Sequence, residues 1–200
     1  MTPPIGIILA GGQATRMGGG DKGLRMLGDQ TLLARVIERL EPQVSDIALN
    51  ANGDPARFAD LNIPVIPDSI DGFAGPLAGV LAGLDWAATQ GADTIVTAAA
   101  DTPFFPCDLV PQLQLATEGT AHPLALAATP DPKRGMARHP TFGLWPVALR
   151  DDLRAALNDG VRKVVLWTDR HDGRLAAFAD EAAFFNVNTP DDLIKAEDML

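Results

Sequence analysis

The feature that most restricts the fold is a short apolar run near the amino terminus that is followed closely by glycines. Ile5–Leu9 contains no polar side chain, and Gly11 and Gly12 come directly after Ala10. A run of this length without alternating polar residues is typical of a strand that is buried on both faces, as strands of parallel sheets are. It predicts a sheet whose two faces are covered by helices.

The rest of the chain alternates between expected strands and expected helices. Short apolar runs predict strands at 47–50, 65–66, 94–99, 124–128 and 141–145, and helical spacing or a proline start predicts helices at 32–40 and 76–88 and from Pro106 and Pro190 onward. Such alternation is typical of α/β proteins with right-handed crossovers. We expect one Rossmann-like nucleotide-binding domain over residues 1–200, with a mostly parallel central sheet flanked by helices.

Charge and composition exclude several classes of partner. The formal net charge of −10 argues against nucleic acid, whose phosphates attract basic surfaces. The apolar runs are far shorter than the roughly 20 residues that a membrane-spanning helix needs. The single cysteine, Cys107, leaves no internal disulfide and suits a reducing compartment. We expect a cytoplasmic protein with no membrane or nucleic-acid partner.

The segment after the first strand collects the cations that a small anionic ligand needs. Residues 9–23 read Leu-Ala-Gly-Gly-Gln-Ala-Thr-Arg-Met-Gly-Gly-Gly-Asp-Lys-Gly. Glycines let several backbone N–H groups point at a phosphate, and Arg16 and Lys22 can neutralise a polyphosphate. The segment is not a P-loop, because neither Ser nor Thr follows Lys22, and its glycines do not match G-x-G-x-x-G. We interpret it as a phosphate-binding loop of another kind.

Polar residues after the other expected strands should meet this loop, because ligands of open α/β sheets bind outside the carboxyl ends of the strands. Asp101 follows strand 94–99 and can hold Mg²⁺ through one carboxylate while phosphates and water complete the shell, or it can cap the following turn. Asn50 and Asp68 stand at the ends of two further strands. Asp68 can accept from the ring N–H and the exocyclic amine of guanine, or it can form a turn.

Taken together, these segments resemble the signature of the molybdenum cofactor guanylyltransferases. The resemblance rests on 9–12, 16–18, 21–24, 101–103 and 186–190, supported by 50–52, Asp68 and 75–79, and so spans nearly the whole chain. It implies a nucleotide-binding α/β domain that transfers GMP from Mg-GTP to molybdopterin carrying molybdenum, with release of pyrophosphate. One departure is Ala100, where the family often has Cys.

The resemblance also assigns residues to each half of the reaction. It implies that Arg16, Lys22 and Asp101 are catalytic, with Asp101 as the Mg²⁺ ligand. It places the nucleotide, GTP, at Leu9, Ala10, Gly11, Gly12, Lys22, Asn50, Asp68 and Asp101. The acceptor is expected at Arg162, Lys163, Asn186 and Asn188, which could equally be a solvated basic patch and capped turns. No general base is needed, because the attacking phosphate is already anionic and positioning can supply most of the catalysis.

Three other activities stay open at this level. A cytidylyltransferase for the same acceptor, a sugar-phosphate nucleotidyltransferase and a non-catalytic nucleotide-binding adaptor would share much of the pattern. Gly11 favours guanine, because cytidine-using relatives tend to carry Ala there, and the joint presence of Arg16, Lys22 and Asp101 favours catalysis. Molybdoenzymes or their chaperones are further partners that the resemblance allows.

Overall fold

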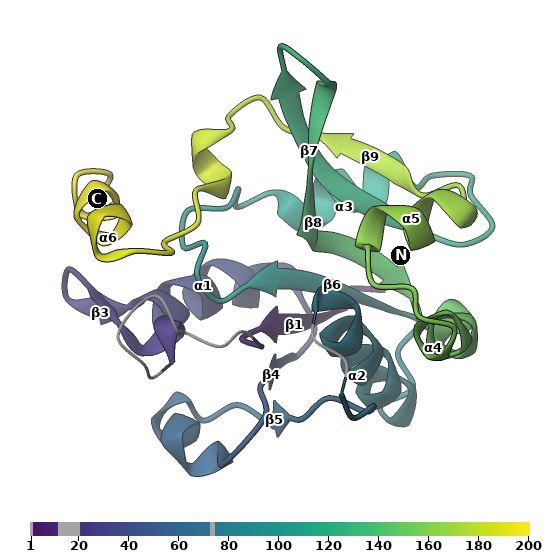
Figure 1. Ribbon diagram of the computed structural model, residues 1–200, viewed down its shortest axis with the longest axis horizontal. Helices are drawn as coiled ribbons and strands as arrows, with labels where there is room; N and C mark the ends of the chain where they lie inside the picture. The colour runs from purple at the N-terminus through teal and green to yellow at the C-terminus, as the bar shows by residue number, and fades with distance from the viewer. Residues whose placement is uncertain (1, 12–20, 73–74) are drawn as a thin grey trace.

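A seven-stranded sheet in the order β5-β4-β1-β6-β8-β7-β9 forms the centre of the protein (Figure 1). The computed structural model describes residues 2–11, 21–72 and 75–200, so the predictions for Gly12 and Arg16 lie outside the described residues. Strands β1 (Ile5–Leu9), β4 (Ile47–Asn50), β5 (Val65–Ile66) and β6 (Thr94–Ala99) are parallel. Their bounds agree with the sequence, and the mostly parallel α/β fold is confirmed.

The other half of the sheet is mixed. Strand β8 (Gly135–Pro146) runs antiparallel to β6 and to β7 (Ala125–Asp131), and β9 (Arg174–Ala177) runs parallel to β7. The far ends of β7 and β8 project from the sheet as a hairpin, seen at the top of Figure 1. A separate two-stranded sheet pairs β2 (Met26–Leu27) with β3 (Gln30–Thr31).

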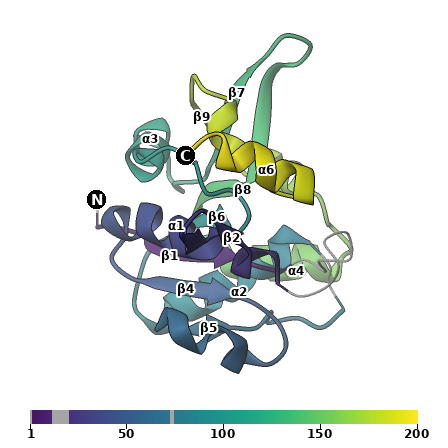
Figure 2. The same cartoon turned by 90° about the vertical axis from the view of Figure 1, so that its left-hand side faces the viewer.

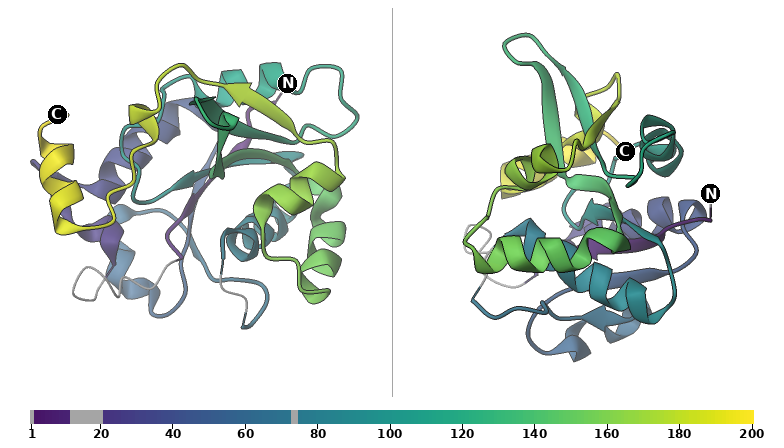
Figure 3. Two further views of the ribbon diagram at one scale, coloured as in Figure 1. Left: turned by 45° about the horizontal axis from the view of Figure 1, so that its top comes forward. Right: turned by 90° about the vertical axis from the view of Figure 1, so that its right-hand side faces the viewer.

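Helices cover both faces of the sheet, as the buried first strand requires (Figure 3). One hydrophobic core joins Ile8, Leu49 and Val96 to α1 (Leu32–Leu40) and α3 (Leu109–Ala116). The other core joins Ile7, Ala48 and Ile95 to α2 (Pro76–Thr89), α4 (Arg150–Asn158) and α5 (Val164–Arg170). Successive strand residues thus enter opposite cores, which is the period-two alternation of a strand. None of the helices in the described part of the chain is long and apolar enough to cross a bilayer.

The last helix, α6 (Pro190–Glu197), returns to the amino-terminal part of the chain (Figures 1 and 2). Val187 and Ala196 share a small core with Leu27 of β2 and Leu32 of α1. The remaining short 3₁₀ helices span Lys22–Leu24, Glu41–Gln43, Pro55–Leu61, Val147–Leu149 and Ala182–Phe184. This return brings the carboxyl-terminal motif beside the segment that carries Lys22.

Some expected elements have other bounds in the structure, and the sequence did not predict α4, α5, β9 or the small sheet of β2 and β3. Helix α3 begins at Leu109 and not at Pro106, because the chain first forms a turn in which Leu109 N donates to the Pro106 carbonyl at 3.1 Å. The strand expected at 141–145 is longer in the structure, because β8 extends into a hairpin with β7. Asp131 Oδ1 stabilises the turn of this hairpin by accepting from the Lys133 and Arg134 amides at 2.8 and 2.7 Å.

Asp152 of α4 connects this helix to α5 through side-chain hydrogen bonds. Its Oδ1 accepts from Trp167 Nε1 at 2.9 Å and lies 2.7 Å from His171 Nε2. The buried Trp167 ring in turn lies 6.2 Å, centre to centre, from the ring of Trp145 in β8. Burial opposes ionisation of Asp152, but the hydrogen bonds from Trp167 and His171 outweigh it, and the pKa of the carboxyl lies below its ordinary value of 3.8.

We expect D152N to destabilise the protein near neutral pH and to do so less in acid. A lowered folded-state pKa contributes stability above the ordinary pKa, and this contribution is lost as pH falls toward the folded-state pKa. The lost hydrogen bonding to the carboxylate should cost roughly 1 kcal/mol, reduced by solvent because the side chain is half exposed. Urea unfolding of both proteins at neutral and acidic pH measures the difference. A gap that stays constant or widens in acid would contradict this account.

Candidate active site

The carboxyl ends of the four parallel strands lie side by side at one edge of the sheet. Ala10 N donates to the Asn50 carbonyl at 3.0 Å, Ala100 N donates to the Leu9 carbonyl at 3.1 Å, and Ala51 N donates to the Ile66 carbonyl at 3.0 Å. A pocket of about 160 Å³ opens here, with walls that include 9–11, 21–23 and 99–101. The expected convergence of the segments after the strands is therefore present.

Two asparagines hold Asp68 at one side of this edge. The buried Asn50 donates from Nδ2 to Asp68 Oδ1 at 3.0 Å and to the Ile66 carbonyl at 3.3 Å. Asn52 donates from Nδ2 to Asp68 Oδ2 at 2.8 Å, and its Oδ1 accepts from Asp68 N at 2.9 Å. A carboxylate has about four acceptor sites, so both oxygens of Asp68 can still accept from a ligand.

At the other side of this sheet edge, three motifs that are far apart in the sequence meet at Lys22. Its Nζ donates to Asn188 Oδ1 at 2.7 Å and lies 3.7 Å from Asp101 Oδ2. Val187 N donates to the Asp101 carbonyl at 2.9 Å, and the Thr102 hydroxyl lies within hydrogen-bond distance of Asn186 Oδ1. The glycine-loop, Asp-Thr-Pro and Asn-Val-Asn segments therefore meet around one ammonium group.

The capping of α6 fixes Asn188 in this position. The Thr189 side chain accepts from Asp192 N at 3.1 Å, while Asp192 Oδ2 accepts from the backbone amides of Thr189 and Asn188 at 3.0 and 3.1 Å. This capping box satisfies the amides at the start of the helix, and its hydrogen bonds lower the pKa of Asp192. The capping box at the start of α6 thus serves to orient the residue that contacts Lys22.

Asp101 is poorly solvated at the end of β6. Burial raises the pKa of its carboxyl, and the nearby Lys22 opposes that shift only in part. A further cation nearby would stabilise the ionised form of this carboxyl. The described residues contain no cluster of three His, Cys, Asp or Glu side chains that could enclose a metal. One carboxylate, with phosphates and water as further ligands, fits the coordination that Mg²⁺ accepts at polyphosphate sites.

The predicted acceptor residues divide into two groups. Asn186 and Asn188 lie beside Thr102 and Lys22, next to Asp101. Arg162 and Lys163 lie on the loop between α4 and α5, where Arg162 Nη1 donates to the carbonyls of Leu157 and Val161 at 2.8 and 2.9 Å. Neither Arg162 nor Lys163 is among the described residues that line the pocket.

Two residues of the site were not predicted to act there. Arg57, in the 3₁₀ helix Pro55–Leu61, lies 2.6 Å from Asp21 through its Nε and Oδ2 atoms. Asn52 orients Asp68, and its spacing of two residues from Asn50 is a signal that could have indicated this role. Arg57 has no such signal, because its acidic partner lies in a remote segment of the chain.

Comparisons with known proteins agree with this geometry. Residues 6–173 match the model of the family described as MobA-like NTP transferase domain. A relative from Cereibacter sphaeroides named molybdenum cofactor guanylyltransferase is 52% identical over 196 residues, covering 98% of this chain and 96% of the relative. A relative of the same name from Rhodopseudomonas palustris is 53% identical over 199 residues, covering 97% and 91%. The chain belongs to the molybdenum cofactor guanylyltransferase family.

Solved structures of lower identity share the fold of this family. Molybdopterin-guanine dinucleotide biosynthesis protein A from Archaeoglobus fulgidus superposes with a TM-score of 0.72 at 24% identity, covering 98% of this chain and 97% of that one. The 4-diphosphocytidyl-2C-methyl-D-erythritolsynthase from Anaerococcus prevotii gives a TM-score of 0.74 at 14% identity, covering 99% and 96%. The fold by itself therefore does not distinguish a guanylyltransferase from that synthase.

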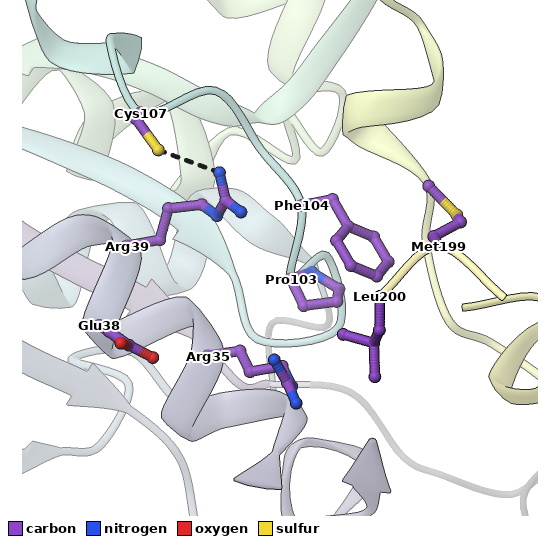
Figure 4. Close-up of a pocket in the computed structure, with 8 residues that line it drawn as sticks. All are labelled: Arg35, Glu38, Arg39, Pro103, Phe104, Cys107, Met199 and Leu200. Atoms are coloured by element: carbon purple, nitrogen blue, oxygen red, sulfur yellow. Dashed lines mark hydrogen bonds between the residues drawn. The ribbon is translucent and has the colours of Figure 1, made fainter. Parts of the chain in front are cut away.

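A larger pocket of about 380 Å³ is lined by residues of α1, of the loop that follows Asp101 and of the carboxyl-terminal segment (Figure 4). Pro103, Phe104 and the carboxyl-terminal Leu200 form part of its wall. The arginines at its rim are engaged with protein groups: Arg35 with the Leu27 carbonyl and Asp29, and Arg39 with the Phe105 carbonyl and the Cys107 thiol. We assign it no ligand.

Gly79 of α2 allows this helix to approach Asn50 and Leu9 at the carboxyl edge of the sheet. An added Cβ would lie 2.8 Å from Leu9 Cδ2 and closer still to Asn50 Oδ1. Gly83, one turn later, would instead bring a Cβ to 2.7 Å from Ile7 Cγ1 and 3.0 Å from Ile95 Cδ1, inside the core. The two glycines therefore make similar close approaches, but only Gly79 faces Asn50.

We expect both G79A and G83A to lower the free energy of unfolding by about 1–3 kcal/mol, the usual cost of overpacking. Only G79A should also weaken GTP binding, because it displaces Asn50 and, through it, Asp68. Urea unfolding and calorimetric titration with GTP measure the two effects. Equal loss of GTP affinity in both variants would show that the effect follows general destabilisation and not the position of Asn50.

Proposed function

We propose that the protein transfers GMP from Mg-GTP to the phosphate of molybdopterin carrying molybdenum, forming the guanine dinucleotide cofactor and pyrophosphate in the cytoplasm. The observation that carries the proposal is the meeting of Lys22, Asp101 and Asn188 beside the backbone of 9–11. Membership of the family supports the same activity.

The nucleotide binds along the carboxyl edge of β1, β4 and β6. The backbone of Leu9, Ala10 and Gly11 lies against it, and Asn50 presents Asp68 to the base. The Lys22 ammonium acts on the phosphates as a point charge, where it stabilises negative charge that develops during in-line displacement. The proposed roles of Gly12 and Arg16 at the phosphates are supported by the resemblance alone.

Asp101 holds Mg²⁺ in this proposal. The fit rests on its partly desolvated carboxylate and on a neighbouring cation that compensates its charge only in part. Held by Asp101, the ion would supply positive charge that neutralises part of the charge on the phosphates. Lys22, 3.7 Å from Asp101 Oδ2, would then exchange its contact with the carboxylate for a contact with phosphate.

The acceptor approaches from the side of the carboxyl-terminal motif. Asn186 and Asn188 offer amide groups to the acceptor next to Lys22. Arg162 and Lys163, which are outside the described lining of the pocket, attract the anionic acceptor from the loop between α4 and α5. No side chain needs to act as general base, since the phosphate nucleophile is anionic near neutral pH. The product passes to molybdoenzymes or their chaperones, and nucleic acids and membranes take no part.

The competing activities have less support. A cytidylyltransferase or a sugar-phosphate nucleotidyltransferase would have the same fold, but the relatives that are about half identical over almost the full chain are named guanylyltransferases. A non-catalytic adaptor would not need a cation placed 3.7 Å from a desolvated carboxylate at the phosphate position.

We expect D101N to abolish transfer and K22A to lower kcat by at least ~10²-fold, as loss of one charge-stabilising group does. D101N preserves the size of the side chain but supplies no anionic metal ligand. Pyrophosphate release from GTP, with molybdopterin present and magnesium varied, measures both variants. Wild-type turnover by D101N would refute its role at the metal.

We expect D68N to remove the preference for GTP over ITP, which lacks the exocyclic amine of guanine. Wild-type enzyme should favour GTP because a buried or oriented acceptor left unpaired costs binding free energy. In D68N the amide no longer offers two acceptor oxygens, so kcat/KM for GTP should fall toward that for ITP. An unchanged ratio of the two kcat/KM values would place the contact to guanine elsewhere.

A further inference from the structure

The guanidinium group of Arg57 lies between the two sides of the nucleotide site. Its Nε lies 2.6 Å from Asp21 Oδ2, its Nη1 donates to the Asp54 carbonyl at 2.9 Å, and its Nη2 donates to the Asn52 carbonyl. Its central carbon lies 4.7 Å from the centre of the Phe58 ring. Each of the three guanidinium nitrogens thus has a partner, and the three nitrogens lie in one plane. A lysine ammonium cannot reproduce this planar set of contacts.

The residues that Arg57 holds belong to opposite sides of the site. Asn52 orients Asp68 through hydrogen bonds of 2.8 and 2.9 Å. Asp21 directly precedes Lys22, and its carbonyl accepts from Leu24 N at 3.1 Å to close the turn that carries the lysine. Arg57 therefore completes a continuous series of contacts from the residue at the base to the residue at the phosphates.

Arg57 also neutralises a carboxylate that would otherwise oppose the ligand. Asp21 is part of the pocket wall beside Lys22, where an uncompensated negative charge would repel a triphosphate. The backbone is shaped around the guanidinium: Gly53 has φ +87°, and a Cβ there would lie 2.9 Å from Arg57 Nη1. The arginine is thus built into the local fold and is not a freely extended surface cation.

We propose that Arg57 is a positioning residue for nucleotide transfer. It neutralises Asp21 and ties it to the segment that orients Asp68, so that Lys22 stands at a fixed distance from the base-binding side. Arg57 acts on the substrate through Asp21 and Asn52 and not by contact with the reacting atoms. This inference rests on the proposed function, because it concerns the same site.

The first test compares R57A, D21N and the double variant R57A/D21N. We expect R57A to lower kcat/KM for GTP by about 10²-fold, the loss that a small misplacement of a catalytic group can cause. The double variant should bind GTP more tightly than R57A, because a neutral amide in place of the Asp21 carboxylate does not repel the triphosphate. Calorimetric titration with GTP and pyrophosphate release measure binding and turnover separately. Losses that multiply in the double variant, or R57A kinetics within about twofold of wild type, would overturn the proposal.

The conservative variant R57K separates charge from geometry. The ammonium can still neutralise Asp21 but cannot also bind the Asn52 and Asp54 carbonyls, so kcat/KM should lie between those of R57A and wild type. This variant also carries the test if R57A does not fold. Wild-type kcat/KM in R57K would refute the need for the planar group.

R154A provides a matched control at the contact between α4 and α2, whose residues Arg154 and Asp85 are not among the described residues of the pocket wall. Arg154 Nη2 lies 2.6 Å from Asp85 Oδ1, with side-chain exposures of 37% and 27%, against 31% and 26% for Arg57 and Asp21. R154A should leave kcat/KM within about twofold of wild type, since distant sites act independently. A loss equal to that of R57A would overturn the positioning role. A wild-type enzyme that forms no pyrophosphate would contradict the proposed function itself, whereas active wild type with normal R57A contradicts only this inference.

Discussion

The interaction between Lys22 and Asp101 governs the organisation of this protein. Each group alone would be an isolated charge at a sheet edge, and a partly buried carboxylate is costly unless a cation compensates it. The ammonium lies 3.7 Å from the carboxylate and within 2.7 Å of Asn188, so it connects β6, the glycine-loop segment and the start of α6. The fold arranges the rest of the site around this one contact.

In the described part of the chain, the side of the site that carries Asp68 is held by neutral hydrogen-bond donors and not by a cation. There the carboxylate of Asp68 is held by neutral amides of Asn50 and Asn52, and among the described residues these amides are what orients it. Neutral donors fix its direction and leave its charge for a ligand that offers two N–H groups. A cationic partner at this position would fix the carboxylate equally well but would weaken its attraction for a base.

The sequence was sufficient for the parallel half of the sheet and for the residues at its carboxyl edge. Strands β1, β4 and β6 each have a glycine or polar residue two positions after their last residue, and their position in an α/β fold dictates which side chains meet. It was not sufficient for α4, α5 and β9, whose packing depends on buried groups such as Trp167 and its bond to Asp152. The pairing of Arg57 with Asp21 could not be foreseen either, because no periodicity connects a 3₁₀ helix to a glycine-rich segment.

Because α6 returns to the amino-terminal part of the chain, the site joins residues that are far apart in the sequence. Lys22 and Asn188 are 166 positions apart, so their contact requires closure of nearly the whole chain. The helix that carries this contact packs through only a small core, with Ile194, Met199 and Leu200 exposed. Fraying of this terminal helix would remove Asn188 while the seven-stranded sheet stays intact. The contact between Lys22 and Asn188 and the stability of the central sheet are therefore separate properties in this fold, and the first can be lost without the second.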